Sequence, residues 1–169
     1  MRSLCHDLER VIPNVIRINR GKLSFSELIG KVFDVEADRL IIVERWKGGP
    51  GRMQFYQVSS DVTRLPPLLI LGGVKTQIDF GRRRRLSKNI AVTVTDDPPT
   101  NIMDLAKFLS QFLKVPLSIT KSSDEKVTTA IQISPIPDGG ARIQVNAPPS
   151  GTEVGPRLIV KKAVWETSR

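Results

Sequence analysis

The spacing of apolar residues along the chain predicts three amphipathic helices. Leucine, isoleucine, valine and phenylalanine recur three or four positions apart, as on one helical face, in residues 4–12, 25–32 and 102–113. Pro13 is expected to end the first helix, because proline lacks the backbone N–H that a helix needs. Ser24 and Glu27 have the spacing of a capping box and predict the start of the second helix, and Asn101 is expected to cap the third.

Short apolar runs between these helices have the composition of β-strands. RLIIVER (39–45) is expected to be a buried strand because its apolar run is continuous, and KGGPG (47–51) predicts a hairpin turn to MQFYQV (53–58). Further strands are expected in VIRI (15–18), PLLIL (67–71), VKTQIDF (74–80), IAVTVT (90–95), VPLSIT (115–120), TTAIQIS (128–134), ARIQV (141–145) and PRLIVKKAV (156–164). The pattern predicts an α/β fold with a mixed sheet, in which residues 1–85 and 86–169 form two similarly organised halves of one domain that spans residues 1–169.

The chain is strongly basic, and the excess charge is concentrated in the first half. Lys and Arg number 26 against 17 Asp and Glu, which gives a net charge of +9. Residues 1–85 carry 16 basic and 9 acidic side chains, so they hold +7 of that total. A charge of this kind is expected of a protein that meets phosphates or another acidic surface.

Cysteine content and hydropathy indicate a soluble intracellular protein. Cys5 is the only cysteine, so the chain can form neither an internal disulfide nor a cysteine-rich zinc site, which fits a reducing compartment. No apolar run approaches the roughly 20 residues that cross a bilayer. The stretch RSLCHDLERV (2–11) has acidic residues where a signal peptide would have an apolar core.

Candidate catalytic residues are few, and an enzyme is not expected. His6 is the only histidine, so no catalytic triad or paired-histidine metal site can be built within the chain. The adjacent acids at 96–97 and 124–125 lie in polar loops, where turn and cap roles are usual. LGGVKT (71–76) departs from a phosphate-binding loop, because Val74 separates the last glycine from the lysine. No metal or cofactor is predicted.

Two connections in the basic half are candidate phosphate contacts. In RINRGK (17–22), Arg17, Arg20 and Lys22 surround a strand-to-helix connection beside the N-terminus of the second helix, where backbone amides favour anions. In ERWKGGPGRMQFY (44–56), Arg45, Trp46, Lys47 and Arg52 surround the hairpin turn, and Trp46 could stack on an unpaired base. The alternatives are a solvated loop in the first case and, in the second, a Trp46 that packs against the adjoining helix.

Four consecutive arginines, Arg82, Arg83, Arg84 and Arg85, lie at the expected junction of the halves. An exposed linker, a nuclear-localisation patch and a contact to nucleic acid or an acidic partner are the three interpretations that the sequence leaves open. In the last case, neutralisation of phosphates would release counterions and give salt-sensitive affinity.

Residues 10–58 resemble the first half of the Brix domain, which is found in proteins that build ribosomes. The family's order is an Ile-Pro, a short strand, Arg-Gly-Lys, a helix, a hydrophobic strand and a Gly-Pro-Gly or Gly-Asn-Pro turn; RGK (20–22) and GPG (49–51) match it. EVGPRLIVKKAVWE (153–166) resembles the closing element of the domain, with Gly155, Pro156 and Arg157 at its Gly-Pro-Arg. Between residues 60 and 150 only the order of strands and helices matches.

The resemblance implies two structurally similar halves, each like the anticodon-binding domain of certain aminoacyl-tRNA synthetases. It implies a non-catalytic role in rRNA processing and ribosomal subunit assembly, through contacts to rRNA or pre-rRNA and to other assembly proteins. A chain without acidic or lysine-rich tails looks like the archaeal stand-alone members, for which a cytoplasmic location is expected; a eukaryotic member would be nucleolar. Arg157 is expected either to contact RNA or to form a structural ion pair. A scaffold that binds an acidic protein without RNA is the alternative function.

Overall fold

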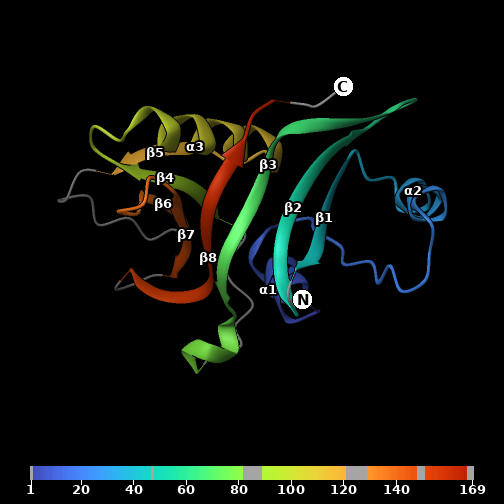
Figure 1. Ribbon diagram of the computed structural model, residues 1–169, viewed down its shortest axis with the longest axis horizontal. Helices are drawn as coiled ribbons and strands as arrows, with labels where there is room; N and C mark the ends of the chain where they lie inside the picture. Colours follow the sequence, from blue (N-terminus) through green and yellow to red (C-terminus); the bar gives the residue numbers. More distant parts are fainter. Residues whose placement is uncertain (1, 47, 82–88, 121–128, 148–150, 167–169) are drawn as a thin grey trace.

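Residues 2–46, 48–81, 89–120, 129–147 and 151–166 are described by the structure, a computed structural model of the chain (Figure 1). Its helices are α1 (Arg2–Val11), α2 (Phe25–Asp34) and α3 (Thr100–Leu113), with a short 3₁₀ helix, η1 (Gln77–Phe80). The strands are β1 (Arg39–Trp46), β2 (Gly49–Val58), β3 (Val62–Lys75), β4 (Ile90–Thr95), β5 (Leu117–Thr120), β6 (Thr129–Pro135), β7 (Ala141–Ala147) and β8 (Thr152–Val164). They form one mixed eight-stranded sheet in the order β1-β2-β3-β8-β7-β6-β4-β5.

Side chains alternate between the two sides of this sheet, and only one side is sealed from water over most of its width. In β6 and β7, Ile131, Ile133, Ile143 and Val145 are buried, and the residues between them are half-buried. A period of two is the geometry of a strand, and this alternation is typical of a sheet with one face on the core. We call the sealed side the inner face and the opposite side the outer face.

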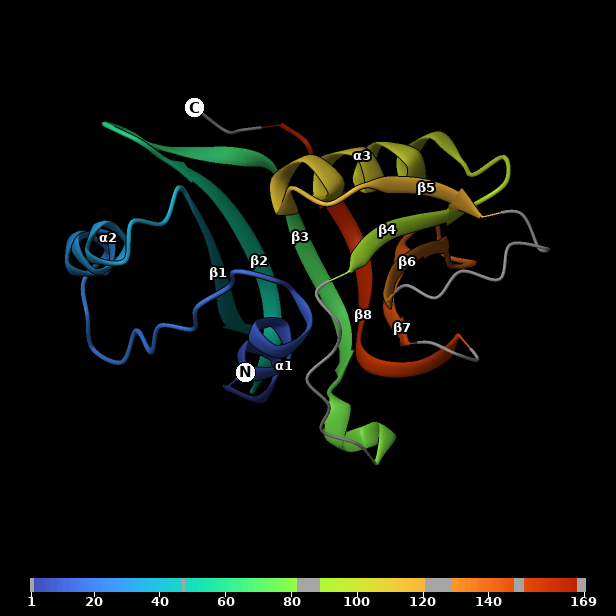
Figure 2. The same cartoon turned by 180° about the vertical axis from the view of Figure 1, so that it is seen from behind.

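The helices α1 and α3 cover the inner face. Leu4 of α1 and Ile102 of α3 belong to the same buried core as Phe55 of β2. The ring of Phe55 meets those of Phe108 and Phe112 edge to face, with centroids 5.0 Å apart in each pair. Figure 2 shows both helices against the same side of the sheet. The apolar stripes predicted for the first and third helices are therefore confirmed.

The helix α2 lies at one end of the sheet, on its outer face (Figure 1). Its Phe25 ring lies 5.6 Å from that of Tyr56, which follows the inward-facing Phe55 on β2 and so points outward. A small second cluster is buried between α2, β1 and β2 but does not belong to the main core; its members are Leu28, Val32, Ile42 and Val58. Phe25, expected on the buried face, is 41% exposed.

The predicted cap of α2 is confirmed, whereas that of α3 is wrong. Ser24 N donates to Glu27 Oε2 at 2.7 Å, and Glu27 N donates to Ser24 Oγ at 3.2 Å, which completes the capping box. At α3 the N-cap position is Pro99, and Asn101 lies inside the first turn. The side-chain amide of Asn101 instead donates to Gly139 O at 3.3 Å, which joins α3 to the turn after β6.

Three strand predictions need correction. Residues 15–18 form no strand, although VIRI has the composition of one, and Ile16 is 63% exposed. VKTQIDF divides: Val74 and Lys75 end β3, and residues 77–80 form η1, which Thr76 N caps through a 2.6 Å hydrogen bond to Asp79 Oδ2. β1 is an edge strand, along which only Ile42 is buried.

The halves meet at the centre of the sheet, where β3 pairs with β8 in antiparallel orientation. Their side chains share one core, in which Phe55 and Leu69 of the first half pack in the same cluster as Val92 and Leu158 of the second. Because the sheet is continuous across the junction, its outer face extends from α2 at one end to β5 at the other.

Candidate RNA interface

The Arg-Gly-Lys connection presents two of its three cations to solvent. Arg20 and Lys22 are exposed, and Gly21 has a φ of +55°, a left-handed conformation that glycine adopts without strain. Arg17 is half-buried and already engaged, since its backbone N–H donates to Glu9 at 3.1 Å and its guanidinium to Asn19 at 2.6 Å. Arg17 is therefore a less available phosphate ligand than Arg20 or Lys22.

The N-terminus of α2 does not offer the free anion seat that the sequence suggested. The carboxylate of Glu27 accepts hydrogen bonds from both the backbone N–H and the hydroxyl of Ser24, at 2.7 Å each. These hydrogen bonds lower the pKa of Glu27, so a negative charge of the protein itself occupies the positive end of the helix. A phosphate bound to Arg20 and Lys22 would have to lie outside the capping box.

At the hairpin, Trp46 does not pack against a helix, which was the alternative considered for it. Its side chain is 56% exposed, and the guanidinium carbon of Arg52 lies 5.0 Å from the centre of its ring. Arg45 reaches back to the turn, with its guanidinium 3.5 Å from Gly48 O. Trp46 thus has a cation over its ring and remains more than half exposed. Lys47 lies outside the described residues.

Arg157 forms a structural ion pair, which is one of the two roles that the sequence analysis considered for it. Its guanidinium pairs bidentately with Glu153; Nε donates at 2.6 Å, and Nη2 also bonds to the carboxylate. The same group lies 5.4 Å from the ring centre of Phe80 in η1. The carboxylate raises the pKa of Arg157, so this charge is permanent but neutralised by its partner. The Gly-Pro-Arg motif is thus part of the joint between η1 and β8.

The arginine run, Arg82 to Arg85, lies outside the described residues, as do residues 86–88. In the sequence the run lies between η1, which ends at Phe80, and β4, which begins at Ile90. A contact between these arginines and RNA stays a prediction.

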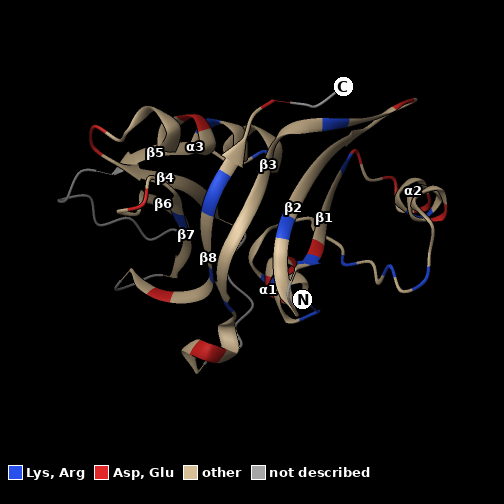
Figure 3. Ribbon diagram, in the orientation of Figure 1, with Lys and Arg blue, Asp and Glu red and all other residues tan. Residues whose placement is uncertain are grey.

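The outer face of the sheet carries a set of basic side chains of which the sequence analysis identified only Arg52 and Arg157. They come from four neighbouring strands, and Figure 3 shows Lys and Arg along β2, β3 and β8. The strand register sets their positions: Arg52 lies opposite Ile70, which lies opposite Lys162. We call this group the basic sheet face; its members are Arg52, Arg64, Lys75, Arg142, Arg157, Lys161 and Lys162.

A row of amides extends the basic sheet face toward β6. Gln144 Nε2 donates to Gln132 Oε1 at 3.1 Å and to Asn146 Oδ1 at 3.3 Å, and Asn146 Nδ2 donates to Gln132 Oε1 at 2.8 Å. Arg142, on the same side of β7, has a buried Nε without a hydrogen-bond partner among the described residues. Such side chains offer donors to phosphate and ribose oxygens.

Gly72 allows Lys161 to lie flat against this face. A Cβ atom at Gly72 would lie 2.5 Å from Cε and 2.6 Å from Cγ of Lys161. The aliphatic stem of the lysine therefore crosses β3 directly over the glycine backbone, and any larger residue at position 72 would displace it. The glycine thus has a packing role.

Of the residues predicted in the two basic connections, the structure places Arg52 of the hairpin on the basic sheet face. Burial raises the pKa of Tyr56 on β2, and the charges of Arg64 and Arg20 oppose this to a smaller extent. The alternation in ARIQVNA (141–147) is a sequence signal that could have revealed the part of this face on β7. A strand has a period of two, which puts Arg142, Gln144 and Asn146 on one side.

Other kinds of site receive no support from the described part of the chain. It contains no group of three or more histidine, cysteine, aspartate or glutamate side chains arranged to hold a metal ion. Within the same residues, no helix is long and apolar enough to cross a membrane.

Comparison with curated proteins finds close relatives along the full sequence, although no family model matches the chain. It is 32% identical over 183 aligned residues, 99% of this chain and 80% of the relative, to a "Probable Brix domain-containing ribosomal biogenesis protein" of Pyrococcus abyssi. A protein with the same description from Methanopyrus kandleri is 33% identical over 68% of this chain and 60% of its own length. One from Pyrococcus horikoshii is 42% identical, but the match spans only 47% of this chain and 36% of that relative.

Solved structures share the fold. A probable ribosomal biogenesis protein from Aeropyrum pernix superposes with a TM-score of 0.75 at 22% identity, over 95% of this chain and 88% of the other. Mil, described as an archaeal Imp4-like protein, superposes with a TM-score of 0.65 at 18% identity, over 98% of this chain and 91% of the other.

Proposed function

Since the chain belongs to the Brix domain-containing ribosomal biogenesis proteins, we propose that it acts in ribosome biogenesis as a non-catalytic factor that binds rRNA or pre-rRNA. In this role it takes part in rRNA processing and subunit assembly together with other assembly proteins. The named relatives are archaeal, which favours the cytoplasm as the place of action. We also propose that each half is built like an anticodon-binding domain; the repeated three-strand meanders β1-β2-β3 and β6-β7-β8 support this.

The observation that carries the proposal is the basic sheet face. Its cations lie on strands of one continuous sheet, so their spacing is held by backbone hydrogen bonds rather than by mobile loops. Among the described residues, only one cation of the basic sheet face has an ion-pair partner: Arg157, which pairs with Glu153. Phosphates of RNA could neutralise the others, with release of counterions.

The composition of this face favours structured RNA that is read through its backbone. The outward residues of β7 and β8 include no aromatic side chain that could serve as a stacking platform; they are mostly amides and cations, with Glu153 and Ile159. Tyr56, the outward aromatic residue of β2, lies against Phe25 of α2. Double-stranded RNA is recognised through phosphates and 2′-hydroxyls, whereas unpaired bases are bound by stacking on aromatic rings. Trp46 is at the margin of the face and is the place where a single unpaired base could stack.

The test is binding to rRNA fragments across a salt series. Lys161→Gln with Lys162→Gln removes two outward charges, and Lys31→Gln with Lys107→Gln removes two exposed charges of α2 and α3 as the matched control. The first variant is expected to make the slope of log K against log salt less steep by about 1.4 to 1.8, because each phosphate contact contributes about 0.7 to 0.9. The control should leave the slope unchanged.

Two outcomes would overturn the proposal. Equal slopes for both variants would show that the basic sheet face does not contact RNA. Salt-dependent binding of an acidic protein, with no RNA affinity, would favour the scaffold alternative. The same titration with Arg82 to Arg85 changed to alanine tests the arginine run separately; unchanged affinity and slope would make it a linker.

A further inference from the structure

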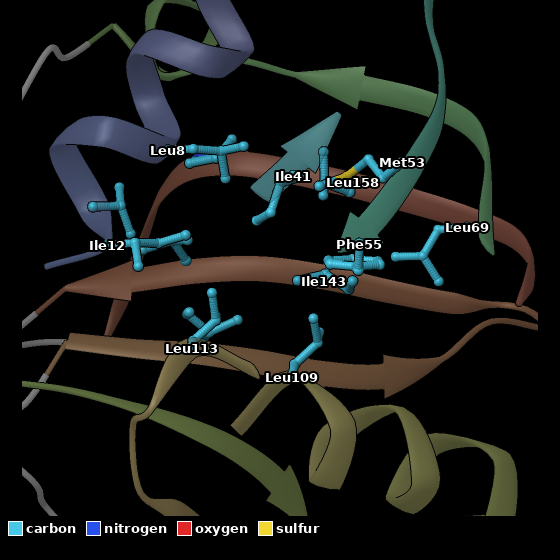
Figure 4. A pocket seen from close by; sticks show the side chains of 14 residues that line it. Leu8, Ile12, Ile41, Met53, Phe55, Leu69, Leu109, Leu113, Ile143 and Leu158 are labelled. Atoms are coloured by element: carbon cyan, nitrogen blue, oxygen red, sulfur yellow. The ribbon is translucent and has the colours of Figure 1, made fainter. Parts of the chain in front are cut away.

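The cavity on the inner face of the sheet is too small and too apolar for an RNA base. It has a volume of about 50 Å³ and lies between α1, α3 and the sheet, with Leu8, Leu109 and Ile41 in its lining (Figure 4). Sites for small organic ligands usually measure about 300 to 1,000 Å³ and contain a few polar groups. RNA contacts are therefore expected on the outer face.

In the second half of the domain, the outer face carries a row of hydrogen-bonding side chains. The pairing of the strands places Thr93 of β4 beside Gln132 of β6, and Gln132 beside Gln144 of β7. Neighbouring strands lie about 4.8 Å apart, so a row across six strands is roughly 24 Å long and can follow a stretch of RNA backbone. We call it the polar row; its members are Ser118, Thr93, Gln132, Gln144, Arg157 and Lys75.

The first half of the same face is different, because it exposes aromatic rings next to cations. Trp46 is 56% exposed beside the guanidinium of Arg52. Phe25 is 41% exposed against the ring of Tyr56, and Arg64 lies opposite Tyr56 in the pairing of β2 with β3. We call these five residues the aromatic region. Exposed rings among cations are typical of surfaces on which unpaired bases stack.

Strongly exposed rings are unevenly distributed over the described chain. In the second half Trp165 is 39% exposed, but its ring meets that of Phe108 in α3, with 6.1 Å between the centroids. Trp165 thus lies on the side of the sheet that α3 covers. Phe25, Phe33 and Trp46 all belong to the first half. Among the described residues, stacking on the outer side is therefore confined to the first half.

Cations connect the aromatic region with the polar row. Arg52 lies opposite Ile70, which lies opposite Lys162, so the two charged residues are two strand spacings, or about 10 Å, apart. Lys162 is exposed and lies on β8, the strand that contributes Arg157 to the polar row. An RNA strand could thus cross the centre of the sheet with its phosphates beside cations.

We propose that the outer face binds a junction between double-stranded and unpaired RNA. The polar row holds the duplex through phosphate and ribose oxygens, and Trp46 and Phe25 each stack on an unpaired base. The inference rests on the proposed RNA-binding function and names the form of RNA that this face selects. Amides donate and accept hydrogen bonds, as the 2′-hydroxyl of a duplex does, whereas stacking on a ring needs a base that is free of its pair.

The experiment measures binding of the full chain to three RNA hairpins that share one stem. The first hairpin has a blunt end, and the second carries about six unpaired adenosines on each strand of that end. The third carries tails of the same length made of abasic nucleotides, which keep the phosphates and remove the bases. The wild type should bind the adenosine tails more tightly than the abasic tails, by about tenfold for each base that stacks.

Substitutions on the two sides of the sheet test where the bases stack. Trp46→Leu and Phe25→Leu remove a ring but keep an apolar side chain, and each should reduce the preference for adenosine over abasic tails about tenfold. Trp165→Leu removes an exposed ring on the α3 side and is the matched control, so it should leave the preference unchanged. Gln144→Met removes an amide of the polar row and should weaken all three hairpins by the same factor, about 2 to 10.

Three results would overturn the inference while RNA binding stands. Equal affinity for the blunt and tailed hairpins would show that the face does not select a junction. Equal affinity for adenosine and abasic tails would show contact through phosphates alone. An equal loss of preference in Trp46→Leu and Trp165→Leu would show that the effect does not arise on the outer face. Failure to bind any of the hairpins would instead contradict the proposed function, and the inference with it.

Discussion

Lys114 and Asp38 lie 76 positions apart in the sequence, yet Lys114 Nζ donates a 2.6 Å hydrogen bond to Asp38 Oδ2. Next to this pair, the guanidinium of Arg39 donates to Gln111 O at 2.6 Å and to Phe112 O, and lies 5.5 Å from the Phe112 ring centre. The carbonyl end of α3 is therefore capped by the guanidinium of Arg39, from the start of β1, and by the backbone N–H of its own C-cap residue, Lys114. These contacts hold the first half of the domain against the second.

The Asp38 to Lys114 pair should make the stability of the protein depend on pH in the acidic range. The hydrogen bond from Lys114 is the main cause that lowers the pKa of Asp38 from its ordinary value of 3.8. A lowered pKa in the folded state stabilises above the unfolded value, and this contribution is lost as pH falls below 3.8 through the folded value. Asp38 is 53% exposed, so the expected share is only about 0.2 to 1 kcal/mol.

Urea unfolding of the wild type and Asp38→Asn at several pH values checks this expectation. The difference in the free energy of unfolding should be present at pH 6 and vanish below the folded pKa, and added salt should reduce it. A difference that persists at low pH would show that Asp38 acts through its shape rather than its charge.

The joint between η1 and β8 predicts a large cost for a methyl group at Gly155. Its φ is +73°, and a Cβ atom there would lie 2.7 Å from Cδ2 and 2.9 Å from Cε2 of Phe80. Gly151 has a similar φ, +63°, with nothing within 4 Å of its Cβ position, and so serves as the matched control. Gly151→Ala should cost about 1 to 2 kcal/mol from backbone strain alone. Gly155→Ala should cost about 1 to 3 kcal/mol more, from overpacking.

Equilibrium denaturation measures both costs, and the Phe80→Ala background isolates the collision. In that background the two glycine substitutions should become equally costly. An excess for Gly155→Ala that survives the loss of the Phe80 ring would contradict the assigned cause.

Substitution of Arg157 should lower stability and leave the salt dependence of RNA binding unchanged. Its side chain is 26% exposed and that of Glu153 is 17% exposed, so Arg157→Gln removes a partly buried, charge-assisted contact worth about 1.5 to 3 kcal/mol. Arg157→Lys should recover less than half of the loss, because lysine can neither pair bidentately nor stack on Phe80 in the same way. Thermal melts and RNA titrations of the same samples give the two readouts. A change in salt slope without a loss of stability would show an RNA contact instead.

Local signals in the sequence predicted the structure correctly where it depends on residues that are close together along the chain. The capping box at Ser24 and the hairpin glycines act over a few residues, so their prediction could succeed without knowledge of the fold. Asn101 shows the limit of such signals, because Pro99 could take the N-cap position and Gly139, which is distant in sequence, offered the amide of Asn101 another acceptor. The resemblance to the Brix domain rested on the order of such local motifs and was confirmed by the relatives.

The candidate site was only partly visible in the sequence for a related reason. Residues 17–22 and 44–52 could be predicted as phosphate contacts because their charges are close together along the chain. Arg52, Lys162 and Arg142 come together only through strand register across the sheet, and Arg157 was removed from the list of free cations by Glu153 and Phe80. Linear clustering of charge does not show which side of a strand a residue occupies or which partner neutralises it.

The sequence by itself determined the class of the protein, its family, most of the helices and strands and the excess of basic residues, because periodicity, caps and charge are properties of short segments. The tertiary structure alone decided that the outer face carries the aligned cations, that α2 lies on the opposite side of the sheet from α1 and α3, and that VIRI is not a strand. A strand needs a neighbour to pair its backbone, and the neighbour that β4 provides for β5 is not present beside residues 15–18 in the described chain.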